Sequence, residues 1–349
     1  MFLTSKTHKA PRLVPVFLLF GLVAGEVWSP VVTEAAETMA DLRLFFGGST
    51  RAQAGGRVEL IEFFNRVARD DDGYYLTKSS LLRDPDNHRR AMAQVRKGLL
   101  VQNFASWQTA SEQLPSVAEW IDVVSYDLEQ WKQSKEEWQD IDQASGSMRD
   151  IASAYRLVYA GHLSNRLAAR NRNDPQSIEH MARHADVYSA AAYPCLEMLD
   201  MDRCVADMRK MMLRARSANP NVVIHVGISL EKDVTLAQQY RYIEGNLDLT
   251  DGVSIFVFPN RPESIGRLKD FVRLLRDRPR ADFDLDFDVD GVDFDLFLAG
   301  FTGPDVGSSR RCDARDLDGD KDIDHADFEV LLRCWSGADI PADPDCANP

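Results

Sequence analysis

The chain has 349 residues, 44% hydrophobic and 28% charged, which is enough for a large core and a smaller second module. Its formal net charge of −14 and pI near 5.0 exclude a long basic surface, and this argues against a nucleic-acid partner. Much of the negative charge falls in about the last 70 residues, so it indicates a local feature rather than a general acidic field.

The N-terminus has the organisation of an export signal. Three basic residues up to Arg12 precede the apolar run 13–23, and small residues follow up to Gly25. This order is typical of a secretory signal peptide, here residues 1–25. An uncleaved membrane anchor is the alternative, but the run is shorter than the roughly 20 residues that span a bilayer. We expect a secreted or cell-surface protein with no membrane span after signal cleavage.

Short strand-like runs then alternate with amphipathic, helix-like runs. The eight strand candidates are 42–46, 73–76, 98–104, 120–128, 156–160, 186–192, 222–228 and 252–258. Helical spacing marks the segments between them, and a last helix is expected at 263–276. Such alternation predicts an α/β fold with a parallel sheet, and eight units predict a TIM-like (β/α)8 barrel over residues 38–278. A doubly wound open sheet is the alternative, although a Gly-rich phosphate loop after the first strand is hardly recognisable.

The fourth predicted strand has two unlike faces. Val124, Tyr126 and Leu128 form an apolar row. The opposite row turns from apolar to polar and ends in Asp127 and Glu129, as expected for a strand that fills a barrel core below and opens into a pocket above. Two carboxylates on one face perturb each other's pKa and suit general acid/base chemistry. A solvent-facing edge strand is the alternative.

In a barrel of this kind, functional residues lie at the C-terminal ends of the strands. The candidates there combine acids, amides and aromatic rings, which suit sugar binding and cleavage. The predicted substrate-binding residues are Asn103, Trp107, His162, Glu231 and Asn260. Glu231 is also an alternative partner for Glu129, because glycosidases need two carboxyl groups roughly 5 to 10 Å apart. A metal-dependent hydrolase is less well supported, since none of the seven histidines lies in an HxH or HExxH pattern.

The segment 125–129, SYDLE, followed by a later strand that ends at Tyr193, resembles strands four and six of the chitinase-type glycoside hydrolase barrels. The resemblance implies that Glu129 protonates the glycosidic oxygen. It implies that Asp127 raises the pKa of that acid or orients the substrate amide, and that Tyr193 donates a hydrogen bond. Ser125 stands where the family usually has a further Asp, so the resemblance covers one strand well and the rest only as architecture.

Two segments near the C-terminus, 282–294 and 316–328, align without a gap as a 34-residue repeat. Each places Asp at positions 1, 3, 5, 9 and 12, the spacing with which an EF-hand loop surrounds calcium. The predicted calcium ligands are Asp282, Asp284, Asp286, Asp290 and Asp293 in the first loop, and Asp316, Asp318, Asp320, Asp324 and Asp327 in the second. Position 6, usually Gly, is Phe287 or Lys321, and Leu285 replaces a small residue at position 4 of the first loop, so the second loop fits the pattern more closely.

The same apolar helical face follows each loop: Phe294, Phe297, Leu298 and Phe301 match Phe328, Leu331, Leu332 and Trp335. This duplication resembles a dockerin, a calcium-dependent adhesion module that docks onto cohesin domains. The resemblance implies a small all-α module over 282–349, two calcium sites and a cohesin-like partner. A disordered acidic tail and a strand are alternatives, but the second copy keeps every Asp while losing the apolar alternation.

Five cysteines fit an exported protein. Cys195 and Cys204 are close enough in sequence to pair, and Cys312, Cys334 and Cys346 fall in the C-terminal module, where connectivity cannot be read. We therefore expect a secreted, glycoside-hydrolase-like barrel that acts on a polysaccharide and is attached through a calcium-binding module. A non-enzymatic surface protein that binds a glycan or a protein is the alternative, and a barrel hydrolase with a different substrate is a third.

Overall fold

The computed structural model describes residues 38–48, 54–76, 85–128, 136–163, 174–191, 200–230, 234–257, 262–304, 306 and 314–347. Eight parallel strands close into a barrel in chain order, with β1 paired to both β2 and β8. The strands are β1 Arg43–Gly48, β2 Gly73–Leu76, β3 Leu99–Phe104, β4 Val123–Leu128, β5 Val158–Leu163, β6 Val187–Ala191, β7 Val223–Ser229 and β8 Gly252–Val257. The predicted barrel is confirmed, and the open-sheet alternative is wrong.

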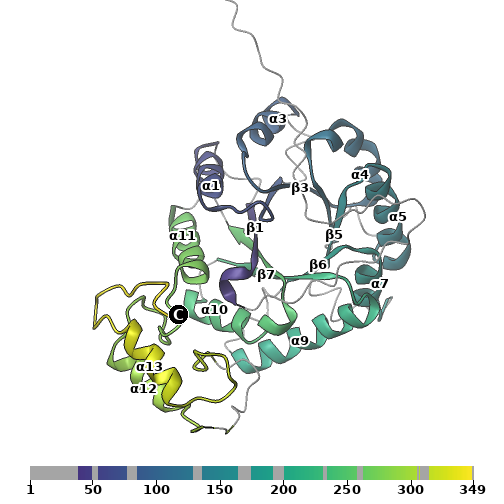
Figure 1. Cartoon of the computed structure of the whole chain (residues 1–349). Coiled ribbons are helices and arrows are strands. Elements are labelled where there is room, and N and C mark those ends of the chain that lie inside the picture. Colours follow the sequence, from purple (N-terminus) through teal and green to yellow (C-terminus); the bar gives the residue numbers. More distant parts are fainter. Residues whose placement is uncertain are drawn as a thin grey trace, which may run out of the picture.

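Helices surround this ring of strands (Figure 1). They are α1 Ala54–Val67, α3 Pro85–Gln94, α4 Trp107–Gln113, α5 Ile141–Ala154, α7 Ser177–His184, α9 Met201–Ala218, α10 Leu236–Glu244 and α11 Pro262–Arg276. Short 3-10 turns lie at η1 Met39–Asp41, η2 Leu114–Ser116, η3 Ala118–Trp120 and η5 Leu247–Leu249. Within the described part of the chain, no helix combines the length and apolar character that crossing a membrane requires.

Side chains alternate between the two faces of each strand, and the apolar ones therefore form two clusters, one outside and one inside the barrel. The outward-facing residues Val124, Tyr126 and Leu128 join the large cluster between strands and helices, as the sequence predicts. The inward-facing Val123 belongs to a smaller cluster drawn only from strand residues, among them Phe45, Val101, Ala160 and Val187. This inner cluster fills the interior, so the barrel is a packed core rather than a pore.

One buried polar residue shares that interior. His225 of β7 lies edge-on to Phe45, with ring centroids 4.5 Å apart. Neither ring nitrogen of His225 has a hydrogen-bond partner among the described residues. Burial lowers the pKa of His225 to about 3, so the imidazole is neutral at pH 7 and fills space as an apolar ring would.

An aspartate precedes each even-numbered strand and ties it to the strand before. Asp72, Asp122, Asp186 and Asp251 accept the backbone N–H groups of Leu44, Leu100, Tyr159 and Ile224, respectively. Arginines from the helix layer neutralise three of these acids: Arg276 pairs with Asp72, Arg149 with Asp186 and Arg216 with Asp251. The N-terminal ends of the strands thus form a base stabilised by hydrogen bonds and ion pairs.

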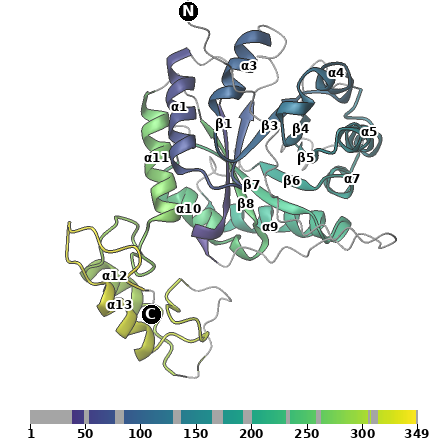
Figure 2. The same cartoon turned by 45° about the horizontal axis from the view of Figure 1, so that its top comes forward.

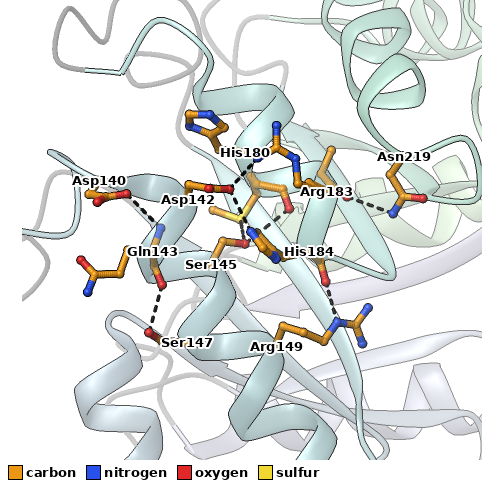
Figure 3. A network of polar contacts seen from close by, with 12 residues as sticks. Asp140, Asp142, Gln143, Ser145, Ser147, Arg149, His180, Arg183, His184 and Asn219 are labelled. Carbon is orange, nitrogen blue, oxygen red and sulfur yellow. Dashed lines mark hydrogen bonds and ion pairs between the residues drawn. The ribbon is translucent and has the colours of Figure 1, made fainter.

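Polar contacts also join neighbouring helices (Figure 3). Asp142 of α5 accepts from both His184 and Arg183 at the end of α7, at 2.9 and 3.0 Å. The hydrogen bond from His184 and the Arg183 charge hold the pKa of Asp142 below its usual range, against the opposing effect of burial. This network lies on the outside of the barrel and stabilises the packing of α5 on α7.

The C-terminal residues form a separate pair of helices beside α10 and α11 (Figures 1 and 2). These are α12 Gly291–Leu298 and α13 His325–Cys334. Their own core includes Val289, Phe297, Ile323 and Leu331. A disulfide between Cys334 and Cys346 closes the end of the chain. Because Arg276 at the end of α11 pairs with Asp72 before β2, the chain enters this module from the base of the barrel.

Candidate functional site

Polar side chains from neighbouring strands line the inner face at the C-terminal end of the barrel. Asn103, Asp127 and His162 occupy β3, β4 and β5, in the same inward row as the core residues below them. Asp127 and His162 are paired in register, and Asn103 pairs with Ser125. The structure therefore brings together three of the predicted site residues.

Asp127 is held by its neighbours. The Asn103 amide nitrogen donates to its carboxylate at 3.2 Å. The Ser125 hydroxyl donates to the Asn103 oxygen, also at 3.2 Å. Both ends of the Asn103 amide are therefore engaged, which orients the amide and, through it, the carboxylate. Ser125, which departs from the chitinase pattern, here acts as a buried support for this chain of hydrogen bonds.

Tyr75 of β2 joins the site from the other side. Its hydroxyl and His162 Nε2 lie 2.9 Å apart, and the two rings meet edge-on. This contact spans strands that are not neighbours in the sheet, so it closes over the inner apolar cluster. Tyr75 was not predicted from the sequence, although it shares the inward parity of Gly73, which pairs with Phe45.

Trp107 lies apart from this row. It is the first residue of α4, is half-buried, and packs against the cluster between strands and helices. Its backbone N–H donates to Glu137, which also accepts from the hydroxyl of Tyr126 on the outer face of β4. Burial raises the pKa of Glu137 to about 7, despite these hydrogen bonds. No sequence pattern marks Glu137 as a buried acid.

Four predicted residues lie outside the described part of the chain: Glu129, Tyr193, Glu231 and Asn260. The signal segment 1–25 lies outside it as well. Cys204 is disulfide-bonded, while Cys195 and Cys312 lie outside the described residues.

The two Asp-rich loops have closely similar structures. The position-12 carboxylate accepts from the backbone at positions 2 and 9, Asp293 in the first loop and Asp327 in the second. Asp290 and Asp324, at position 9, cap the helices that follow. Positions 4 and 6 have positive φ in both loops, which is the turn for which an EF-hand loop normally needs Gly at position 6.

The residue that follows each helix forms a backbone hydrogen bond to the loop of the other repeat. Ser336, after α13, donates its backbone N–H to the carbonyl of Val289 in the first loop at 3.0 Å. Thr302, which is 34 residues earlier and follows α12, does the same to Ile323 in the second loop, also at 3.0 Å. The sequence repeat is therefore a repeat of structure with mutual contacts, as in a paired loop-helix module.

Carboxylate oxygens converge in each loop. Oxygen atoms lie within 4.8 Å of one another in the groups Asp282, Asp284 and Asp293; Asp288, Asp290 and Asp293; Asp316, Asp318 and Asp320; and Asp322, Asp324 and Asp327. Asp288 and Asp322, at position 7, also join these groups, although they are not among the predicted ligands. Burial and the neighbouring charges of Asp293, Asp286 and Asp282 raise the pKa of Asp284 to about 6. A hard divalent cation would relieve this repulsion.

No protein-family model and no curated protein matches the sequence. Among solved structures, a mandelate racemase/muconate lactonizing protein from Herpetosiphon aurantiacus aligns with 14% identity and a TM-score of 0.40, over 64% of this chain and 55% of that one. A β-1,3-glucanosyltransferase from Rhizomucor miehei aligns with 8% identity and a TM-score of 0.43, over 62% of this chain and 87% of that one. Triosephosphate isomerase from Bartonella henselae aligns with 13% identity and a TM-score of 0.42, over 67% and 99%.

The chain spans about half the length of the two mandelate racemase/muconate lactonizing proteins it matches, 55% and 53%, the second from Rubrobacter xylanophilus. These neighbours differ in their chemistry and are distant in sequence. The function of this barrel therefore has to be argued from its own residues.

Proposed function

We propose that this protein is a secreted glycoside hydrolase whose barrel cleaves a polysaccharide and whose C-terminal module attaches it through calcium. The barrel half rests on one observation: Asp127 is fixed on the inner face by Asn103, beside His162 of the next strand. Glu129, two residues on, has the same parity in sequence. In the proposed site the two carboxylates would therefore lie on the same face of β4.

In this mechanism Glu129 protonates the glycosidic oxygen as its bond to the anomeric carbon breaks, and water adds its hydroxyl to that carbon and returns a proton to Glu129. Asp127 raises the pKa of that acid or orients the substrate amide. Asn103 keeps the Asp127 carboxylate in place, and the hydrogen-bonded pair of Tyr75 and His162 offers polar groups to the sugar hydroxyls. The module leaves the barrel at its base, so attachment through it would keep the C-terminal ends of the strands open to a long polymer.

Hydrolysis of a panel of polysaccharides by wild type, Glu129→Gln and Asp127→Asn tests the barrel. We expect Glu129→Gln to lower kcat by about 10²- to 10⁴-fold, the usual contribution of a general acid. Glu119→Gln changes an exposed acid in η3, near the N-terminal end of β4, and should leave activity unchanged. Equal activity of wild type and Glu129→Gln would remove Glu129 from the mechanism. Binding of a glycan without cleavage by the wild type would favour a non-enzymatic surface protein.

The calcium half is supported by the matched backbone of the two loops and by their converging carboxylates. Asp282, Asp284, Asp286, Asp290 and Asp293 would hold one ion, and Asp316, Asp318, Asp320, Asp324 and Asp327 the other. Calcium supplies the charge that lets these carboxylates lie together. A cohesin-like protein is the partner we propose for the assembled module.

Titration calorimetry with calcium tests this half independently of the barrel. We expect two ions per wild-type chain and one in the variants Asp316→Ala and Asp327→Ala, because each removes a ligand of the second loop only. Asp343→Ala, an exposed acid outside both loops, is the matched control and should still bind two. A wild-type chain that binds no calcium would contradict the proposal.

A further inference from the structure

The two loops differ at the positions where their sequences depart from the repeat. Positions 4 and 6 are Gly319 and Lys321 in the second loop, and both are exposed. In the first loop they are Leu285 and Phe287, and both are half-buried. The φ angles of Leu285 and Phe287 are 74° and 78°, a left-handed conformation that is strained for bulky side chains. Two large apolar residues at such positions need a compensating contact.

The barrel supplies that contact. Leu285 and Phe287 pack against the large apolar cluster between strands and helices of the barrel. The guanidinium of Arg273, on α11, lies over the Phe287 ring at 4.0 Å from its centroid. This geometry is that of a cation–π interaction. The side chains that make the first loop an imperfect calcium loop are therefore the ones that join it to the barrel.

A second link reaches the first ligand position. Arg278 donates to the hydroxyl of Tyr240 on α10 at 2.7 Å and to the backbone carbonyl of Asp282. The Asp282 side chain is fully buried, whereas Asp316, its counterpart in the second loop, is partly exposed. The first loop is thus held from α10 as well as from α11.

A cavity lies between other parts of the module and the barrel. A cavity of about 740 Å³ separates Leu296 and Arg315 of the module from Met201 on α9 and Arg241 on α10. Leu285 also lines this cavity. Among the described residues, the apolar and cation–π contacts given above come from the first loop, and both views show the module beside α10 and α11 (Figures 1 and 2).

We propose that the first loop fastens the module to the base of the barrel, that calcium bound in this loop holds the fastening, and that the second loop is the accessible calcium site. The calcium part of this inference rests on the function proposed above. Ligation fixes the backbone that presents Leu285 and Phe287 to the barrel, whereas without the ion the carboxylates repel one another. Linkage then requires that docking strengthens calcium binding at the first site.

Small-angle X-ray scattering on the full mature chain, with calcium and with chelator, tests the fastening. The wild type should be compact with calcium and extended without it. The double variant Leu285→Gly/Phe287→Gly should stay extended with calcium, although glycine suits positive φ and calorimetry should still count two ions. Lys321→Gly makes the equivalent change at position 6 of the second loop and should behave as wild type.

A double variant that binds two ions and is as compact as wild type would overturn the fastening. So would a wild type whose dimensions do not respond to chelation. A wild type that binds no calcium would instead overturn the calcium function, and the coupling with it, which separates the two failures.

A substitution on the barrel tests the same coupling without changing the sequence of the loop. Arg273→Ala should weaken calcium binding at one of the two sites by about 2- to 10-fold and leave the other unchanged, because it removes the cation–π contact to Phe287. Lys269→Ala, on the same helix but paired with Glu59, should change neither site. Equal affinities in Arg273→Ala and wild type at both sites would contradict the coupling.

Discussion

The barrel and the C-terminal module are stabilised by different means. The barrel has an inner and an outer apolar cluster, and buried acids at its base are paired with arginines from the helix layer. The module has one small apolar cluster, a disulfide and two loops in which carboxylates face one another. The barrel therefore carries its own countercharges, whereas in the function proposed above the module takes its countercharge from calcium.

The pKa values reflect this difference. In the barrel, the Arg214 side chain holds the pKa of Glu179 below its usual range, despite burial. In the module, burial raises the pKa of Asp282 to about 6, and the charge of Asp293 adds to this effect. A cation bound among these carboxylates would relieve their repulsion, so its binding would stabilise the fold of the module.

Calcium removal should therefore separate the two parts, and this is the largest effect we expect. Chelation should abolish the cooperative unfolding transition of the module, while the transition of the barrel remains. Differential scanning calorimetry with and without chelator measures both transitions. Magnesium at the same concentration is the control, because it demands a smaller and more regular coordination shell. Two unchanged transitions after chelation would contradict the comparison.

The base of the barrel offers the converse test. Asp72→Ala leaves the Arg276 charge buried and the Leu44 N–H without its acceptor, so we expect the barrel to lose about 3 to 5 kcal/mol of stability. Asp71→Ala removes only a surface pair with Arg43 and should cost less than about 1 kcal/mol. Urea unfolding of both variants, with calcium present, measures the difference. The transition of the module should not move in either variant.

Sequence patterns predicted the barrel because eight apolar runs recur between amphipathic segments, and each run overlaps an observed strand. The boundaries were less accurate. The fifth strand begins at Val158 rather than 156, because Arg156 adopts a positive φ of 57° in the preceding turn. The fourth begins at Val123 rather than 120, because Ala118–Trp120 forms a 3-10 turn. Turn geometry of this kind is not encoded in apolar periodicity.

Sequence patterns predicted those site residues whose position follows from the alternation of side chains along a single strand. Parity alone places Asp127 on the inner face, and strand order places Asn103 and His162 beside it. Tyr75 was missed because its contact with His162 crosses the closed barrel. The base aspartates were missed as well, although Asp72, Asp122, Asp186 and Asp251 each stand directly before a strand. Their role appears only once the register between strands is known.

The smallest effect we expect concerns Glu137, a buried acid of the barrel whose hydrogen-bond donors among the described residues are a hydroxyl and a backbone N–H rather than an arginine. This acid accepts hydrogen bonds from Tyr126 and from the Trp107 backbone, and burial raises its pKa from 4.5 to about 7. The folded state therefore favours the protonated form. Its contribution to stability is complete below the unfolded pKa and is lost as pH rises through about 7.

Wild-type barrel stability should accordingly fall between pH 5 and pH 8 relative to Glu137→Gln, by on the order of 2 to 3 kcal/mol. The comparison with Glu137→Gln isolates this acid, because the raised pKa values of the module are common to both proteins. Urea unfolding of the barrel at several pH values, with calcium held constant, measures it. Glu136→Gln, its exposed neighbour, should follow the wild type. Parallel pH curves for wild type and Glu137→Gln would mean that folding does not raise the pKa of Glu137, and would contradict this prediction.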